Sequence, residues 1–178
     1  MRKRYWGGLL LAGALIGAYV AGVRIAPLSS KLDVAAISQT AKTYDALIER
    51  DKFGVPHISG LRDADVAFGL GYAHSEDDFA TILDAIITTR GRAAEIKGKD
   101  AAVGDYLVQL LRVWESVDAG YESQIMPQAR AVMQGYADGV NLYASQNPTK
   151  VPAGIFPLSG RDVAAGTVFR GPDRKSVV

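Results

Sequence analysis

The stretch that decides the fold reads IERDKFGVPHIS at residues 48–59 and, after a short gap, AFGLGYAHSEDDF at residues 67–79. Gly54 and Pro56 interrupt the first segment, whose side chains otherwise alternate between apolar and polar. Two glycines punctuate the start of the second segment, which has the composition of a helix. The combination predicts a pair of strands followed by a helix that packs closely on its neighbours.

The strand pair can be placed more closely from the pattern around it. Alternation over residues 43–50 predicts the first strand, and Leu47 breaks the alternation, so we expect partial burial on both faces. Residues 51–54 have turn composition. Pro56 excludes a helix and favours extended backbone before it, which predicts a second short strand at residues 55–58.

Helices are predicted to dominate the rest of the chain. The first begins near Val66 with Asp63 or Asp65 as its N-cap, and Arg90 and Arg92 lie where cations favour a helix C-terminus. Each of three predicted helices carries one apolar stripe: Phe79, Ile82, Leu83, Ile86 and Ile87; Leu107, Leu110, Leu111 and Trp114; Val132, Met133, Tyr136, Val140 and Tyr143.

The boundaries of the third helix follow from its proline residues. It begins at Pro127, a residue suited to the first helical position, and stops before Asn147 and Pro148. Frequent Pro and Gly predict a looped segment over 148–171, with a short helical piece after Ser159.

The chain is divided into four parts: a leader, a connecting segment, a folded domain and a tail. Three cations open the chain, and Trp6 to Val23 carry no charge, so residues 1–24 are interpreted as a signal peptide or signal anchor; cleavage and anchoring both stay open. Residues 25–43 form a linker or a short first helix, and residues 44–172 form the folded domain. Residues 173–178 resemble translated sequencing adapter, which predicts a truncated chain with a non-native tail.

Composition narrows the function classes. Without the leader the chain keeps 16 cations and 19 acids, a net charge of −3, and no cationic cluster. Nucleic acid is therefore not expected as a partner, because its binding depends on clustered cations. Cysteine is absent, which excludes disulfides, a thiolate nucleophile and cysteine-ligated metal.

The side chains that invite a search for an active site each have a simpler interpretation. His57 is interpreted as a half-buried histidine bonded to backbone rather than as a base, since no serine, aspartate or second histidine lies at a telling spacing. His74 and Asp78 share a helical face at i, i+4, as metal ligands can, but a third ligand is missing. Asp77 and Asp78 point to different faces, which argues against a carboxylate dyad.

Glycine and tyrosine residues in the helices are assigned to packing. Gly69 and Gly71 lack the third glycine and the following Lys-Ser/Thr of a phosphate loop, so close helix packing is the preferred interpretation. Tyr72, Tyr136 and Tyr143 are assigned to the core. No nucleophile with an adjacent base can be assembled, so the prediction is no catalytic residue and no metal ligand, with the substrate-binding residues unknown.

Four ordered motifs resemble the start of the penicillin acylase family, over about residues 46–169. They are IERDKFGVPHI at residues 48–58, GLGYAHSED at residues 69–77, TRGRAAEIKGKD at residues 89–100 and QGYADGVN at residues 134–141. The second departs from the family's usual Gln-Asp-Arg ending, which points to a divergent branch.

The resemblance implies an α+β fold, here the helical α-chain part, with two short strands, of an αββα sandwich of the N-terminal-nucleophile hydrolases. It implies an exported precursor that cuts itself into an α and a β chain. The N-terminal residue of the β chain is the nucleophile, and its own amine is the base. Substrates in the family include penicillins, cyclic lipopeptides and acyl-homoserine lactones, and many members hold a structural calcium.

We therefore expect the N-terminal part of a periplasmic or extracellular amidohydrolase, inactive without its β chain. A transient or anchored membrane contact is expected through residues 6–23. Its strands are expected to leave unpaired edges and its helices an uncovered apolar face. The alternative is a non-catalytic, membrane-anchored helical interaction domain, which would fold cooperatively alone.

Overall fold

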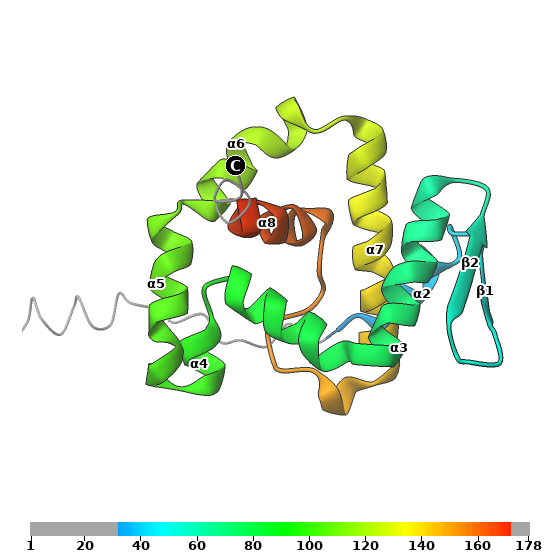
Figure 1. The fold of residues 1–178 in the computed structure, drawn as a ribbon, viewed down its shortest axis with the longest axis horizontal. Coiled ribbons are helices and arrows are strands. Elements are labelled where there is room, and N and C mark those ends of the chain that lie inside the picture. Colours follow the sequence, from blue (N-terminus) through cyan, green and yellow to red (C-terminus); the bar gives the residue numbers. More distant parts are fainter. Residues whose placement is uncertain (1–31, 172–178) are drawn as a thin grey trace, which may run out of the picture.

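The computed structural model describes residues 32–171, and Figure 1 shows their arrangement. A hairpin lies at one end and the short helix α5 at the other. The elements in chain order are α2 (Val34–Ala41), β1 (Ala46–Arg50), β2 (Pro56–Gly60), α3 (Asp63–Thr89), α4 (Ala93–Lys97), η1 (Lys99–Ala101), α5 (Ala102–Leu110), α6 (Val113–Gln124), α7 (Pro127–Gln146), η2 (Pro148–Lys150) and α8 (Gly160–Arg170). The predicted leader, residues 1–24, and the predicted non-native tail at residues 173–178 lie outside the described residues.

The two strands form the predicted hairpin. They pair antiparallel, with Ile48 opposite Ile58, and these two side chains face α3. Leu47 is 56% exposed on the other face, so the expected burial on both faces of the first strand is wrong. The alternation is regular: one face of the hairpin covers α3, and the other faces away from the described chain.

Helix α3 begins at Asp63, and the predicted N-cap at Asp63 or Asp65 is wrong. Arg62 occupies the N-cap position, and Asp65 reaches back to accept a hydrogen bond of 3.0 Å from its backbone N–H. The second carboxylate oxygen of Asp65 accepts from the Asp45 backbone N–H at 3.3 Å. Asp65 therefore joins the start of α3 to the chain that enters the hairpin.

Helices α3 and α7 make the main packing contact. A Cβ added at Gly71 would lie 2.2 Å from the Tyr136 carbonyl oxygen, and one at Gly139 would lie 2.1 Å from that of Phe68. No side chain fits at such separations, so glycine is needed for the two backbones to touch. The interpretation of Gly71 as a packing residue is confirmed.

The main core lies around the second half of α3. The predicted stripe of this half is confirmed: Phe79, Ile82, Ile86 and Ile87 are buried, and Leu83 packs against them. Val140 and Tyr143 of α7 complete this cluster with the buried loop residues Ile155, Phe156 and Leu158. The start of α7 at Pro127 and its end before Asn147 are also as predicted.

The predicted second helix is wrong in both extent and orientation. The segment forms two helices, α5 and α6, separated at Arg112, whose φ of 52° is left-handed. Leu107, Leu110 and Leu111 are exposed, whereas Val108 is buried. The apolar side chains were assigned to a core-facing stripe, but most of them lie on the outer face.

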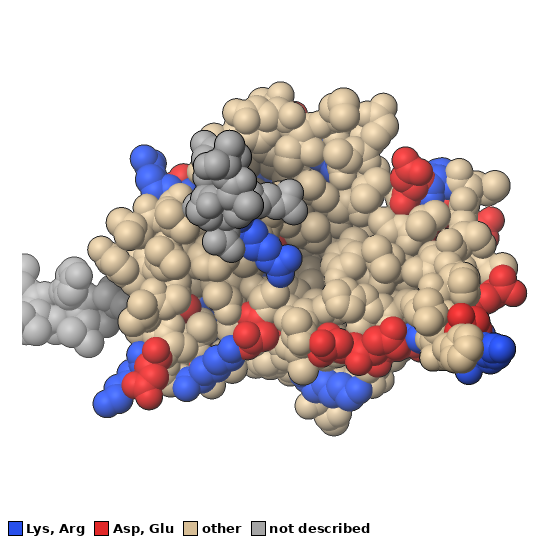
Figure 2. Space-filling model, viewed as in Figure 1, with Lys and Arg blue, Asp and Glu red and all other residues tan. Residues whose placement is uncertain are grey.

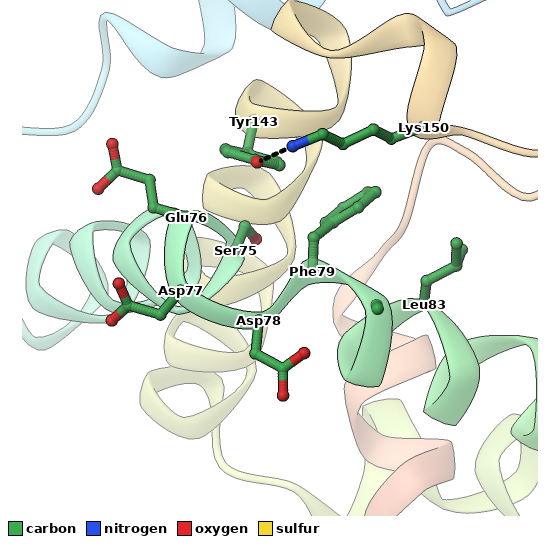
Figure 3. A pocket seen from close by; sticks show the side chains of 9 residues that line it. Ser75, Glu76, Asp77, Asp78, Phe79, Leu83, Tyr143 and Lys150 are labelled. Carbon is green, nitrogen blue, oxygen red and sulfur yellow. Dashed lines mark hydrogen bonds between the residues drawn. The ribbon is translucent and has the colours of Figure 1, made fainter.

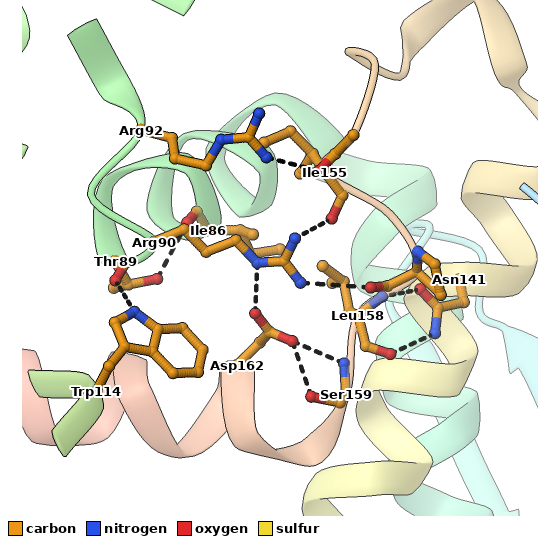
Figure 4. A network of polar contacts seen from close by, with 12 residues as sticks. Ile86, Thr89, Arg90, Arg92, Trp114, Asn141, Ile155, Leu158, Ser159 and Asp162 are labelled. Atoms are coloured by element: carbon orange, nitrogen blue, oxygen red, sulfur yellow. Dashed lines mark hydrogen bonds and ion pairs between the residues drawn. The ribbon is translucent and has the colours of Figure 1, made fainter. Parts of the chain in front are cut away.

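The looped segment after α7 is held by polar contacts, which Figure 4 shows. Arg90 Nε donates to Asp162 Oδ1 at 2.6 Å, and Arg90 Nη1 donates to the Ile155 carbonyl. Asn141 makes two hydrogen bonds with the backbone of Leu158, at 2.8 and 2.7 Å. Helix α3 ends at Thr89, so Arg90 and Arg92 lie just past its C-terminus as predicted, and they also fasten the loop and the first turn of α8 to α3.

Two remaining expectations concern the ends of the domain. Of the alternatives for residues 25–43, the short helix is observed at Val34–Ala41, where Asp33 Oδ1 accepts from the Ala36 N–H. The helical piece after Ser159 is observed as α8. Among residues 32–171, no helix has the length and apolar character to cross a bilayer, and the proposed membrane contact at residues 6–23 lies outside that range.

Candidate functional site

A hollow of about 370 Å³ lies where α3 bends. Asp78 has φ −151° and ψ 65°, so the helix is interrupted there and a second helical segment starts. The hollow is lined by Ser75, Glu76, Asp77, Asp78, Phe79, Ala80, Leu83, Tyr143 and Lys150, as Figure 3 shows. The bend brings apolar and charged groups together at one surface.

The groups in the hollow that could react already have partners. Ser75 is fully buried, and its Oγ donates to the Gly71 carbonyl at 2.7 Å. Lys150 Nζ donates to the Tyr143 hydroxyl at 2.7 Å. Among residues 32–171, no imidazole or carboxylate forms a hydrogen bond with the Ser75 hydroxyl, so within this range the serine lacks the adjacent base that activates a nucleophile.

The acids beside the hollow form ion pairs and helix caps. Arg50 Nη2 lies 3.0 Å from Glu76 Oε2 and 2.9 Å from Asp77 Oδ1, which ties the hairpin to α3. Asp78 Oδ1 accepts from the Thr81 N–H at 3.2 Å, and hydrogen bonds from Thr81 lower the pKa of Asp78. The lowered pKa keeps Asp78 ionised at neutral pH, which does not suit the role of a general acid.

His74 and Asp78, which were predicted to share a helical face, do not form a metal site in the described residues. The bend at Asp78 ends the regular i, i+4 relation, and His74 Nδ1 lies 2.8 Å from the Tyr136 hydroxyl. Burial raises the pKa of Tyr136, so the phenol stays protonated. Nowhere in residues 32–171 do three His, Cys, Asp or Glu side chains come together as a group that could hold a metal ion.

His57 differs from its prediction. Its side chain is 65% exposed, and Nε2 lies 3.5 Å from Asp51 Oδ2 instead of bonding to backbone. Backbone N–H groups of Phe53 and Val55 lower the pKa of Asp51. The histidine is therefore a surface residue of β2, and the expected half-buried position is wrong.

Of the three tyrosines assigned to the core, only Tyr143 is buried. Tyr72 is half-buried, and its hydroxyl donates to Gln146 Oε1 at 2.9 Å. The ring of Tyr143 packs against Phe79 with centroids 5.1 Å apart. The aromatic side chains therefore connect α3 and α7, which is a packing role.

The polar network of Arg90, Asn141 and Asp162 was not found from the sequence. The side chain of Asp162 is 3% exposed, and Asn141 as a whole residue is 4% exposed. The sequence shows an arginine just past the end of a predicted helix and an asparagine among the apolar residues of a predicted stripe. Neither observation identifies a hydrogen-bond partner, because the partners lie 72 and 17 residues away.

Charged groups on the surface are mixed in sign. Figure 2 shows acids and cations interspersed along one rim and at the ends of the molecule, while the centre of that face is hollowed and largely uncharged. In the described part of the chain, the geometry supplies a rigid frame and a hollow without an activated nucleophile.

The chain was compared with known proteins. The family model of penicillin amidase matches residues 45–165. The chain belongs to the penicillin amidase family. This confirms the resemblance that the four motifs carry.

Two curated relatives illustrate the range of members. The acyl-homoserine lactone acylase PvdQ of Pseudomonas savastanoi pv. phaseolicola is 30% identical over 151 residues, which cover 80% of this chain and 19% of the relative. The penicillin acylase 2 proenzyme of Pseudomonas sp. strain SE83 is 31% identical over 134 residues, or 73% of this chain and 16% of the relative. The chain thus spans less than a fifth of the length of these family members.

A solved structure confirms the fold. The thermostable penicillin G acylase from Alcaligenes faecalis superimposes with a TM-score of 0.58 and 23% sequence identity, covering 75% of this chain and 75% of that chain. The expected α+β fold, the mainly helical part of an N-terminal-nucleophile hydrolase with two short strands, is therefore observed.

Proposed function

We propose that this chain is the scaffold part of an amidohydrolase that cleaves linear amides between an acyl group and an amine. The nucleophile would come from the β chain of the same precursor. The observation that carries this proposal is the combination of family membership with a hollow whose only serine is buried and bonded to backbone.

The open edges of the hairpin support the proposal of a partner that adds strands. Within residues 32–171, β1 and β2 pair only with each other, so each has an outer edge of free N–H and C=O groups. Leu47, Phe53 and Val55 are 56%, 79% and 52% exposed around it. An open edge with apolar side chains is favourable only where further strands pair with it.

The solved neighbour supports the same division. The match to penicillin G acylase covers equal shares of both chains, so that solved chain has about the length of this one. The curated relatives are more than four times as long. A part of this size therefore exists as a separate chain in a solved acylase.

The relatives support two substrate classes, acyl-homoserine lactones and penicillins, and we propose an acylated amine of this kind. Export to the periplasm or beyond follows from the proposed role of residues 1–24. A structural calcium in the full protein belongs to the same proposal, because the family resemblance implies one.

A chimera tests the proposal. Residues 45–165 replace the matching segment of the P. savastanoi acylase, and hydrolysis of an N-acyl-homoserine lactone and of a penicillin is followed by detection of the released amine. The expected result is amide hydrolysis by the chimera and none by the present chain alone. A chimera carrying Gly71→Leu, which would overlap the Tyr136 backbone, is the inactive control.

Two outcomes would overturn the proposal. Hydrolysis by the present chain alone would place the nucleophile within it. A soluble chimera, with both parts assembled, that cleaves neither amide would show that the scaffold does not belong to this chemistry.

A further inference from the structure

The fourth motif, at residues 134–141, places two polar side chains on one side of α7. Gln134 and Asp138 are four residues apart, so they share a helical face, and both are half-buried. Asp138 contacts Tyr44, which lies 94 residues away at the entry to the hairpin, and Gln134 contacts Gly160, the first residue of α8. Figure 1 shows α7 between the hairpin and α8. The motif therefore links two parts of the chain that do not follow each other in sequence.

The first link holds the chain that enters the hairpin. The Tyr44 hydroxyl donates to Asp138 Oδ2 at 2.7 Å. Burial, together with the hydrogen bond to Asp138, raises the pKa of Tyr44, so the phenol stays protonated and acts as the donor. Its ring stacks on Phe68 of α3, with ring centroids 4.5 Å apart and planes 7° from parallel. The hydroxyl is therefore held beside α7 by a contact that does not depend on the carboxylate.

The second link starts at the other oxygen of the same carboxylate. Gln134 Nε2 donates to Asp138 Oδ1 at 2.9 Å, and the Gly160 backbone N–H donates to Gln134 Oε1, also at 2.9 Å. An ionised carboxylate only accepts and a backbone N–H only donates, so the amide of Gln134 has one orientation that satisfies both neighbours. Asp138 therefore determines which end of Gln134 faces Gly160.

The start of α8 depends on this acceptor. The first N–H groups of a helix have no partner within the helix, and Gly160 opens α8. The preceding N–H, of Ser159, donates to Asp162 Oδ2 at 2.8 Å, whereas that of Gly160 donates to Gln134. Gly160 is buried, so loss of the acceptor leaves a backbone donor away from water. The first turn of α8 is therefore sensitive to the orientation of one side chain on α7.

We propose that Asp138 and Gln134 couple the entry of the hairpin to the start of α8. Asp138 is a positioning residue, which accepts from the Tyr44 hydroxyl with one oxygen and orients the Gln134 amide with the other. When Tyr44 shifts, the carboxylate turns, the amide loses its fixed orientation and the Gly160 N–H loses its acceptor. Because a coupling free energy is reciprocal, a displacement of α8 loosens Tyr44 by the same free energy. This coupling lies within the described chain and does not rest on the proposed function.

Amide hydrogen exchange at single residues, followed by NMR on the present chain, tests the coupling. The readout is the exchange rate of Gly160 relative to that of Leu158, whose N–H donates to a different side chain of α7, Asn141, at 2.7 Å. General loosening of the fold accelerates both amides, whereas the coupling acts on Gly160 alone. Asp138→Leu removes both acceptors, and Tyr44→Phe removes only the hydroxyl and keeps the aromatic ring.

Two further variants serve as controls. Tyr72→Phe is matched to Tyr44→Phe, since it removes another hydroxyl that bonds to α7, at Gln146, without touching this network. Gln134→Met keeps the length of the side chain and removes the amide, which breaks the link itself. Tyr44→Phe is therefore also made in the Gln134→Met chain, where its effect on Gly160 should vanish.

The expected result is an exchange rate of Gly160, relative to Leu158, that is about tenfold higher in D138L and about threefold higher in Y44F, with Y72F unchanged. Circular dichroism checks that each variant is folded, and if D138L is not, Y44F alone decides. An unchanged relative rate in folded D138L or in Y44F would overturn the proposal. So would an effect of Y44F that persists in the Q134M chain, because the hairpin would then act on α8 by another path.

Discussion

Helices α7 and α5 both carry apolar side chains at helical spacing, yet the structure uses them differently. On α7 the backbone approaches α3 so closely that Gly139 has no room for a Cβ, and Val140 beside it is fully buried. On α5 the space around Gly104 is open, and Leu110 faces solvent. An apolar stripe therefore marks a surface that is covered in the complete protein, but it does not identify the chain that covers it.

The same substitution in both helices gives the largest contrast. Gly139→Ala forces a Cβ against the Phe68 carbonyl, and we expect a loss of about 3 kcal/mol in the free energy of unfolding. Gly104→Ala meets no atom within 4 Å, and we expect a gain of about 0.5–1 kcal/mol because alanine favours the helix. Urea unfolding of both variants measures the difference; equal effects would show that the α3–α7 contact is looser than described.

The polar contact that joins α8 to α3 comes next. Asp162→Asn weakens the bond to Arg90 and leaves a guanidinium that is only 20% exposed, so we expect a loss of about 2–3 kcal/mol. Asp118→Asn is the control, since its pair with Arg161 is largely exposed and is worth about 0.5 kcal/mol or less. Thermal unfolding compares the two. Similar melting temperatures for both variants would show that the contact between Asp162 and Arg90 does not stabilise the fold.

One valine of α5 lies on its buried face and another on its exposed face, so substitutions at the two positions test the two faces separately. Val108→Ala removes buried methyl groups, and we expect a loss of about 1–2 kcal/mol. Val103→Ala, at a position 77% exposed, should change stability by less than about 0.5 kcal/mol in the chain alone. Denaturant midpoints measure both. A large loss for Val103→Ala would mean that the chain itself covers the stripe.

The last prediction concerns a change that occurs only in acid, at Asp65, which joins α3 to the hairpin. The hydrogen bond from the Arg62 side chain lowers the pKa of Asp65 to about 2, against an ordinary value of 3.8. Because the folded-state pKa is depressed, the stabilisation is complete above pH 4 and is lost as the pH falls toward 2.

Melting temperatures between pH 6 and pH 2 test this effect. The wild-type chain should lose more stability below pH 4 than Asp65→Asn does, because the variant has no carboxylate to protonate. Parallel curves for the two proteins would contradict the assignment.

The sequence predicted those elements whose cause is local. Pro56 and the turn before it gave the hairpin, and Pro127 gave the start of α7, since both act on their own backbone. The packing role of Gly71 also followed, because no phosphate-binding pattern surrounded it. The family resemblance came from the same residues.

What the sequence left unpredicted depends on distant partners. The stripe from Leu107 to Trp114 was assigned to one helix, since nothing local marks the left-handed turn at Arg112. Asp162 meets Arg90 only through the tertiary fold, and the exposed position of His57 depends on what covers the hairpin. The hollow at Asp78 was not predicted from the sequence, and the expectation that the nucleophile comes from outside this chain stays a prediction.

The central claim is that this chain is a frame with a finished core and surfaces completed by a larger chain. Amide hydrogen exchange tests it most directly, by comparing residues 102–110 with residues 127–146 in the chain alone and in the assembled chimera. The account predicts slow exchange in α7 in both states, and exchange in α5 that is fast alone and at least tenfold slower after assembly. Exchange in α5 that is equal in the two states would contradict it.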